Sequence, residues 1–240
     1  MVTDLEMIEK LQQFDTPSIT NVVATYPRNP LCLALYNPWS MNWYTDASLR
    51  CWYPEMGPVV GYAVTTVYGL PDPNYKGLSL ADVVDAMASS PQPTVWVFEQ
   101  RFPPEIANKV GLSGGNMTTS IKTAGCVGAI TNGPSRDIDE IRPMGFQYLT
   151  SGVCAGHGDM AIHAVNVPVS VAGMDVSPGE IIHMDENRAV KFPAEYLAEV
   201  LDRVTRLRDQ EEANMSRMRG ATNATQVRDI LAGGHYGKKG

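Results

Sequence analysis

Arg136 and Asp137 are adjacent in the stretch AITNGPSRDIDEI, residues 129–141, directly after a short apolar run and an Asn-Gly-Pro turn. A carboxylate such as Asp137 can bind Mg²⁺, which usually takes one or two protein carboxylates together with waters and substrate oxygens. The planar guanidinium of Arg136 can bind a substrate carboxylate through two parallel hydrogen bonds. The spacing alone favours a simpler interpretation. Asp137 could stabilise the first turn of a helix through Ile138 and Ile141, with Arg136 as its exposed ion-pair partner.

A glycine pair precedes a predicted helix in the stretch LSGGNMTTSIKTAG, residues 112–125. Backbone N–H groups at the start of a helix lie at the positive end of its dipole, where they can bind a carboxylate or a phosphate. Glycines are also common in ordinary strand-to-helix turns, so this pattern alone leaves both interpretations open. The candidate anion site consists of the backbone amides of Gly114, Gly115, Asn116 and Met117.

Strands and helices alternate around these two segments, which predicts an α/β fold. β-Branched and apolar runs predict strands at 57–69, 94–100, 126–131, 146–152 and 167–173, and two more strands within 174–193. Apolar residues at helical spacing predict helices at 79–90 and 113–125, and a short helix after Asp137. Both candidate segments therefore lie where a strand or loop leads into a helix.

The two ends of the chain are predicted to be helical. Apolar spacing indicates a helix at 3–13, a second helix starts near Asp15, and a long helix follows Pro193 and stops near Gly220. We expect one domain over 1–220 and a loosely held tail at 221–240. Residues 27–57 are rich in proline, tryptophan and tyrosine without a clear period, so we expect an irregular arm there that could pack on another subunit.

Composition excludes several classes of protein. The net charge of −7 over 240 residues, with no basic block before the final GKKG, argues against a nucleic-acid partner. No run of 18 apolar residues exists, so no membrane span is expected. The four cysteines have no C-x-x-C spacing and the N-terminus lacks a signal-peptide pattern, so we expect reduced thiols in a cytoplasmic protein.

Two other groups of residues could do chemistry but fit it poorly. His157, Asp159 and His163 lie close in sequence, yet their spacing fits no single helix face, so ordinary hydrogen-bonded histidines are favoured over metal ligands. Cys154 lies in a glycine-containing stretch with no base nearby in the sequence, which disfavours a nucleophile.

Taken together, GGNMTTSIKTAGCVGAITNGPSRD, residues 114–137, resembles the signature of the RraA-like family. This family includes the 4-hydroxy-4-methyl-2-oxoglutarate aldolases and the regulators of ribonuclease E activity. The resemblance covers about 55–195, because the strand at 57–69 and the segment 171–193 are similar to the family's early strand and closing segment.

The resemblance implies a swivelling β/β/α-type fold that forms a homotrimer or homohexamer. In the aldolase members the amides equivalent to Gly114, Gly115, Asn116 and Met117 hold the carboxylate of the pyruvyl group. Arg136 then corresponds to the substrate-binding arginine and Asp137 to the ligand of a divalent metal such as Mg²⁺ or Mn²⁺. The implied activity is retro-aldol cleavage or decarboxylation of a small 2-oxo or hydroxy dicarboxylic acid, such as 4-hydroxy-4-methyl-2-oxoglutarate or oxaloacetate.

Two positions depart from the aldolase pattern. Gly115 stands where aldolase members carry an acidic residue for proton transfer, and Asn132 replaces another acid of the loop. Proton transfer could instead involve Glu99, Asp159 or a carboxylate of the 195–212 helix of a neighbouring subunit. Two alternatives to an aldolase are a non-catalytic, protein-binding regulator and a divergent enzyme that uses the same pocket for another hydroxy-acid reaction.

Overall fold

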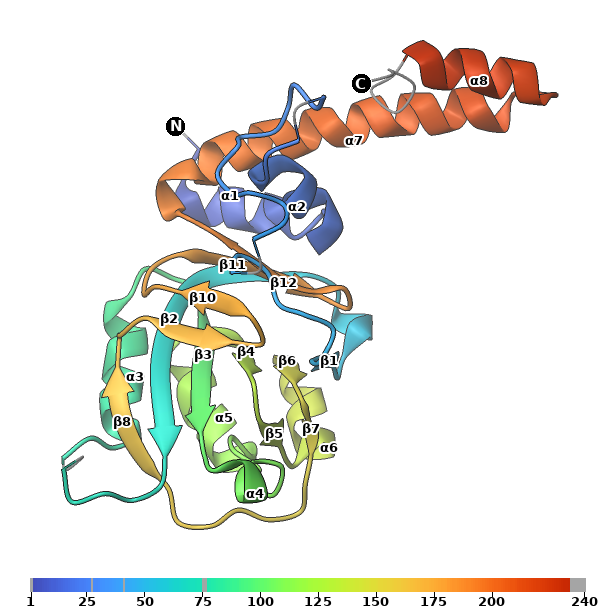
Figure 1. The fold of residues 1–240 in the computed structure, drawn as a ribbon. Helices are drawn as coiled ribbons and strands as arrows, with labels where there is room; N and C mark the ends of the chain where they lie inside the picture. Colours follow the sequence, from blue (N-terminus) through green and yellow to red (C-terminus); the bar gives the residue numbers. More distant parts are fainter. Residues whose placement is uncertain (1, 27, 41, 75–76, 234–240) are drawn as a thin grey trace.

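The computed structural model describes residues 2–26, 28–40, 42–74 and 77–233. Within them, a mixed sheet has the strand order β1-β6-β4-β3-β2-β11-β12 (Figure 1). Its parallel centre consists of β2 (Val59–Gly69), β3 (Thr94–Arg101), β4 (Cys126–Thr131) and β6 (Gln147–Thr150). Three strands pair antiparallel at the ends of this order: β1 (Arg50–Cys51), β11 (Ile181–Asp185) and β12 (Arg188–Phe192).

Strand β2 pairs with two different strands along one edge. Its first half pairs with β11, where Tyr62 lies opposite Ile181, and its second half pairs with β8 (Ala161–Val165), where Gly69 lies opposite Ala161. Every residue of β2 after Val59 is buried. The long β-branched run in the sequence is typical of such a strand, because both of its faces are covered.

The two faces of the sheet carry different layers. On β3, Trp96 and Phe98 belong to a cluster under the helices α3 (Leu80–Ser89), α5 (Gly115–Thr123) and α6 (Ile138–Ile141). The alternate residues Val95 and Val97 belong to a second cluster on the other face, under the hairpin of β9 (Val169–Val171) and β10 (Met174–Val176). This alternation follows from the two-residue period of a strand.

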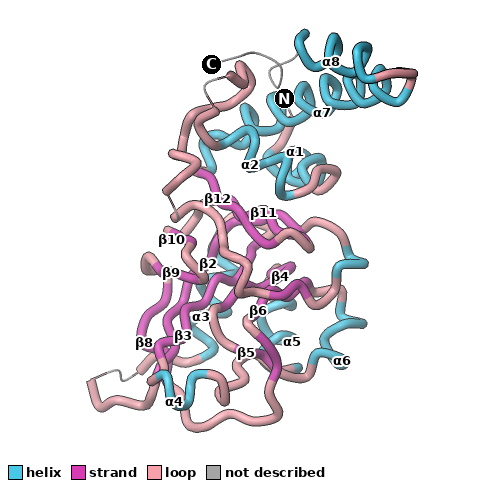
Figure 2. Tube along the Cα trace, turned by 45° about the vertical axis from the view of Figure 1, so that its right-hand side comes forward, coloured by secondary structure: helices cyan, strands magenta, loops and turns pink. Residues whose placement is uncertain are grey.

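A third cluster lies between β11–β12 and a separate group of helices (Figure 2). This group contains α1 (Asp4–Leu11), α2 (Thr16–Val23) and α7 (Leu197–Arg219), and α7 extends well beyond the sheet (Figure 1). The predicted starts of the first two helices are confirmed, since Thr3 forms a capping box and the Asp15 side chain accepts from the amide of Ser18. The predicted α/β fold with N-terminal helices and a long C-terminal helix is confirmed.

Within 28–40 and 42–57, the regular elements are short, namely β1 and a 3-10 turn at Pro54–Met56, and several large side chains pack inside the chain itself. Trp43 belongs to the third cluster, Leu49 and Cys51 to the cluster under the hairpin, and Tyr53 to the cluster under α3 and α5. The indole N–H of Trp43 donates to the backbone oxygen of Asn37 at 3.0 Å. In its described part, this segment therefore connects all three clusters.

Several short elements differ from the sequence analysis. The region around His163, for which no strand was predicted, forms β8, and the segment 174–193 forms three strands rather than two, since β10 is separate from β11. The structure also has a short helix α4 (Pro104–Ala107) and the two-stranded pair β5 (Pro134–Ser135) with β7 (Gly152–Val153). These elements are too short to produce a clear period in the sequence.

The region predicted as a tail contains helix α8 (Ala224–Gly233), which lies beside the end of α7 (Figure 1). The last part of the predicted tail, 234–240, lies outside the described residues. In the described part of the chain, none of the helices combines the length and the apolar character needed to cross a bilayer.

A buried polar cluster joins the N-terminal helices to β11. Thr16 donates its backbone N–H to the Asp185 carboxylate at 2.8 Å, and its hydroxyl lies 2.9 Å from Nδ1 of His183. The other ring nitrogen of His183 lies 3.2 Å from the backbone oxygen of Leu11. Burial lowers the pKa of His183, against the smaller raising effects of the Leu11 carbonyl and the Asp185 carboxylate.

This lowered pKa predicts a pH-dependent stability. The unfolded chain binds a proton at His183 more readily than the folded chain does, so stability is complete above the ordinary histidine pKa of 6.5 and falls below it. The free energy of unfolding, measured by urea denaturation between pH 7.5 and pH 5.5, should decrease by at most about 1.4 kcal/mol per pH unit from this group.

The variant His183→Gln should have a flatter dependence on pH over this range. The matched control is His157→Gln, which changes an exposed histidine and should retain the wild-type slope. An equal slope in His183→Gln and wild type would contradict the assignment.

Candidate functional site

The start of α5 is held against the loop that carries Arg136 and Asp137. The backbone N–H of Leu112 donates to the backbone oxygen of Pro134 at 3.1 Å. The Ser135 hydroxyl donates to the backbone oxygen of Ser113, also at 3.1 Å. Ser113 has a left-handed backbone with φ of 71°, and the extended Gly114 then caps the helix. The two candidate segments of the sequence therefore lie side by side.

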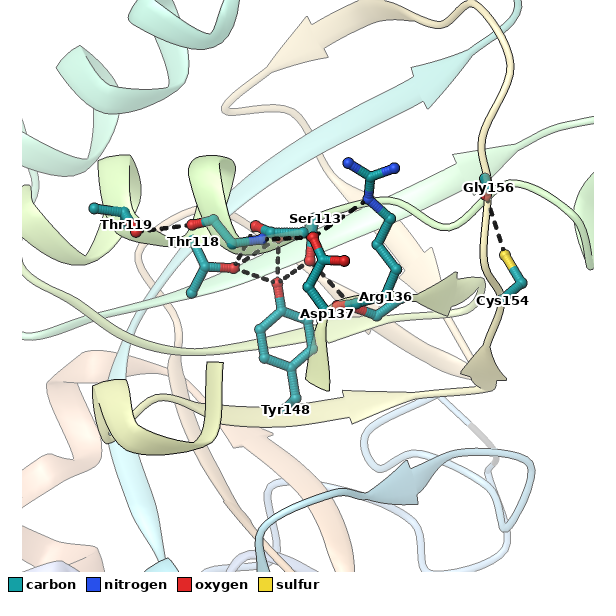
Figure 3. A network of polar contacts seen from close by, with 11 residues as sticks. Ser113, Thr118, Thr119, Arg136, Asp137, Tyr148, Cys154 and Gly156 are labelled. Carbon is teal, nitrogen blue, oxygen red and sulfur yellow. Dashed lines mark hydrogen bonds and ion pairs between the residues drawn. The ribbon is translucent and has the colours of Figure 1, made fainter. Parts of the chain in front are cut away.

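The Asp137 carboxylate bonds to helix α5 and not to its own helix. Asp137 is the N-cap residue of α6, with a left-handed φ of 58°, but its side chain makes no capping hydrogen bond there. Instead its Oδ2 accepts from the backbone N–H of Gly115 at 3.0 Å (Figure 3). The simpler interpretation is confirmed in part: Asp137 lies at the start of α6 and pairs with Arg136, but its carboxylate makes no hydrogen bond to that helix.

Arg136 contacts the same carboxylate oxygen through one nitrogen only. Its Nε lies 3.5 Å from Oδ2 of Asp137, and its two terminal nitrogens point away from that carboxylate (Figure 3). The two side chains are 34% and 36% exposed, so both can be reached from solvent. The two terminal nitrogens of the guanidinium are therefore positioned to bind a group other than Asp137.

Asn116 and Met117 occupy the next positions of the first turn of α5. The N–H groups of a first helical turn have no acceptor within the helix, so these two amides remain as donors beside Asp137. The amide of Gly115, which the sequence analysis included among the anion-binding groups, is already bonded to Asp137. The predicted anion site is therefore partly filled by the chain's own carboxylate.

A buried tyrosine supports the strained turn before α5. The Tyr148 hydroxyl lies 3.1 Å from the backbone oxygen of Ser113 and 3.1 Å from the Thr118 hydroxyl, and it also contacts the Ser113 hydroxyl (Figure 3). Burial raises the pKa of Tyr148 well above its ordinary value, against the smaller lowering effect of these hydroxyls. Tyr148 therefore stays a neutral phenol and acts as a fixed hydrogen-bonding partner.

The departure at Asn132 has a structural reason. Its Oδ1 accepts from the backbone N–H of Gln100 at 2.7 Å, and its Nδ2 donates to the backbone oxygen of Gln100 at 3.1 Å. An ionised aspartate at this position could only accept, so it would lose the second bond. The amide fixes the loop before Arg136 to the end of β3.

Glu140 is a carboxylate near the site that the sequence analysis did not select. A Cβ atom on Gly115 would lie 2.6 Å from Oε2 of Glu140 and closer still to Oε1. Likewise a Cβ on Gly114 would lie 2.8 Å from Nε of Arg136 and would overlap the Asp137 carboxylate. The three-residue spacing from Asp137 to Glu140 was the available signal, because such residues share a helix face.

The other candidate acids and nucleophiles lie elsewhere. Glu99 pairs with Arg101 at 2.8 Å and accepts from the backbone N–H of Ser170, in β9 on the far side of the sheet. Asp159 lies in an exposed loop. Proton transfer by a carboxylate of a neighbouring subunit stays a prediction. His157 and His163 bond to backbone oxygens, as expected for ordinary histidines, and the Cys154 thiol contacts the backbone oxygen of Gly156.

The donor set suits a hard cation held in an open site. The described residues contain no group of three or more histidine, cysteine or acidic side chains that could enclose a metal ion. Mg²⁺ rarely needs such a group, because it retains waters and takes substrate oxygens beside one or two carboxylates. Asp137, whose side chain is 36% exposed, fits that mode as a single protein carboxylate.

Comparisons with known proteins agree with this arrangement. The family model RraA-like, described as Aldolase/RraA, matches residues 40–190, which include every residue of the site. An uncharacterized protein of Methanocaldococcus jannaschii, MJ0644, is 28% identical over 119 residues, covering 49% of this chain and 56% of that protein. The chain spans less than two-thirds of the length of the curated relatives it matches.

Two solved structures share the fold. An uncharacterized protein from Pseudomonas syringae pv. tomato has a TM-score of 0.71 at 18% identity, covering 95% of both chains. RraAS2 of Streptomyces coelicolor, described as an unusual member of the RNase ES inhibitor RraA protein family, has a TM-score of 0.64 at 19% identity. The alignment with RraAS2 covers 91% of this chain and 98% of that one. With a family match over most of its length, this chain belongs to the RraA-like family, which includes both lyases and ribonuclease inhibitors.

Proposed function

We propose that this chain is a divalent-metal-dependent carbon–carbon lyase. Its substrate is a small 2-oxo or hydroxy dicarboxylic acid, such as 4-hydroxy-4-methyl-2-oxoglutarate or oxaloacetate, which it cleaves by retro-aldol reaction or decarboxylates. The observation that supports this proposal is the contact of Asp137 with the N-terminus of α5 beside Arg136. A carboxylate, a guanidinium and the amides of a first helical turn lie together in one accessible site.

Asp137 would hold the metal, since it is an accessible carboxylate fixed by a backbone bond. Mg²⁺ or Mn²⁺ supplies a Lewis acid that polarises the 2-oxo group of the substrate when bound. The terminal nitrogens of Arg136 are directed away from Asp137, so they can bind a substrate carboxylate or the oxygen on which negative charge develops (Figure 3). The amides of Asn116 and Met117 can orient the carboxylate beside the ketone.

The subunit arrangement proposed with this function is a homotrimer or homohexamer. Trp39 is 89% exposed and Met215 of α7 is 42% exposed, so these two apolar side chains are accessible to a neighbouring subunit. Light scattering coupled to gel filtration should give three or six times the mass of one chain. A monomer at micromolar concentration would contradict this part of the proposal.

Replacing Asp137 by alanine should abolish metal-dependent release of pyruvate, because the carboxylate that holds the metal is gone. The measurement is a coupled pyruvate assay with 4-hydroxy-4-methyl-2-oxoglutarate and with oxaloacetate, with and without EDTA. The matched control is Asp139→Asn, which removes an exposed acid of the same helix and should retain activity.

Equal rates in wild type and Asp137→Ala would refute the role of Asp137. A wild type with neither metal binding nor turnover, which instead captures a large protein partner, would favour the regulator. Turnover of another hydroxy acid alone would favour a divergent enzyme.

Replacing Arg136 by lysine should lower kcat by roughly 100-fold, in the range found when one charge-stabilising donor is lost, because an ammonium group cannot make two parallel hydrogen bonds. The affinity for Mn²⁺, measured by electron paramagnetic resonance, should stay unchanged, because Arg136 is not a ligand. A variant that loses metal affinity together with activity would show that Arg136 serves only to hold Asp137 in place.

A further inference from the structure

Glu140 places a second carboxylate at the start of α5. It lies in α6, and the backbone bond from its N–H to the oxygen of Asp137, 3.1 Å long, sets the turn that directs both side chains toward α5. Its carboxylate occupies the space that a Cβ atom of Gly115 would need. The Asp137 carboxylate stands in the same relation to Gly114.

Room for these two acids explains the glycine pair better than backbone conformation does. Neither glycine has a positive φ, and Gly114 has an extended backbone with φ of −81° that any residue can adopt. A side chain at either position would instead displace a carboxylate. Both carboxylates therefore lie against the start of α5, one at each glycine.

The two carboxylates differ in their bonding. Asp137 is fixed by the Gly115 amide and by Arg136. The side chain of Glu140 has no hydrogen-bond or ion-pair partner among the residues that the structure describes. A fixed carboxylate suits a metal ligand, whereas a carboxylate without a partner can accept a hydrogen bond from a hydroxyl of the substrate.

We propose that Glu140 is the proton-transfer group of this site and that it supplies, from α6, an acid which Gly115 cannot carry. This inference rests on the proposed lyase function. The Glu140 carboxylate accepts the proton of the C4 hydroxyl of a 4-hydroxy-2-oxo acid. The C3–C4 bond breaks, its electron pair forms the enolate of pyruvate, and the C4 fragment leaves as a carbonyl compound.

The same group completes the reaction. The protonated Glu140 donates its proton to C3 of the enolate, which gives the methyl group of pyruvate and restores the carboxylate. Glu140 accepts one proton from the substrate and later returns one proton to the product, so the reaction requires no further reactant. A purely structural role, in which Glu140 only offsets the dipole of α5, would leave proton transfer to another group.

Exchange of the methyl protons of pyruvate with D₂O isolates this step, because it requires protons to move to and from C3 without cleavage of a C–C bond. We would measure it by NMR with Mg²⁺ and measure Mn²⁺ affinity separately by electron paramagnetic resonance. The variant Glu140→Gln should exchange at least about 100-fold more slowly, the usual size of a general acid–base contribution. Its Mn²⁺ affinity should stay within about threefold of wild type, because Asp137 holds the metal.

A carboxylate moved to the glycine should restore the exchange. In the double variant Gly115→Asp/Glu140→Ala, the new side chain enters the space that Glu140 leaves. It should recover at least about a tenth of the wild-type exchange rate, since a group of the same chemistry lies at the same place. Asp139→Asn is the control for loss of negative charge on α6 and should exchange like wild type.

Unchanged exchange in Glu140→Gln, with exchange present in wild type, would overturn the role of Glu140 alone. Parallel losses of Mn²⁺ affinity and exchange would also overturn it, because Glu140 would then be a ligand. Absence of both Mn²⁺ binding and exchange in wild type would overturn the lyase proposal and this inference with it.

Discussion

The arrangement of the site depends on one hydrogen bond, from the backbone N–H of Gly115 to the carboxylate of Asp137. It joins the start of α5 to the start of α6, two helices that lie on the same face of the sheet. Non-glycine residues in the left-handed region cost about 1 kcal/mol or more each, and two of them, Ser113 and Asp137, flank this bond. The surrounding contacts of Tyr148 and Ser135 hold both turns in place.

The long elements could be predicted because each has a strong local signal. The β-branched run gave β2 within two residues, and the Ser79 start and the apolar spacing gave α3. Strand β8 could not be predicted in the same way, because five residues that include a histidine show no clear alternation. Strand β8 forms because it pairs with the second half of β2. This pairing is set by the tertiary fold and leaves no signal in the local sequence.

The candidate site was predicted in its parts but not in its connections. Spacing and resemblance selected Gly114, Gly115, Arg136 and Asp137, and these residues do lie together. Two features depend on how α5 and α6 approach each other in space: the group that accepts the hydrogen bond from the Gly115 N–H, and the direction of the Glu140 side chain. The sequence analysis interpreted Asn132 as the loss of an acidic residue. In the structure its amide makes two hydrogen bonds to the backbone of Gln100, and an ionised carboxylate could not donate the second of them.

The segment from Trp43 to Tyr53 has a consequence for how the molecule opens. It places a large side chain in each of the three apolar clusters within eleven residues of chain. A fluctuation that displaces this segment disturbs the packing of all three clusters at once, so it couples the opening of regions that are far apart in the fold. Amides of β3, in the sheet centre, and of α2, in the outer helices, should consequently exchange with solvent through the same rare event rather than independently.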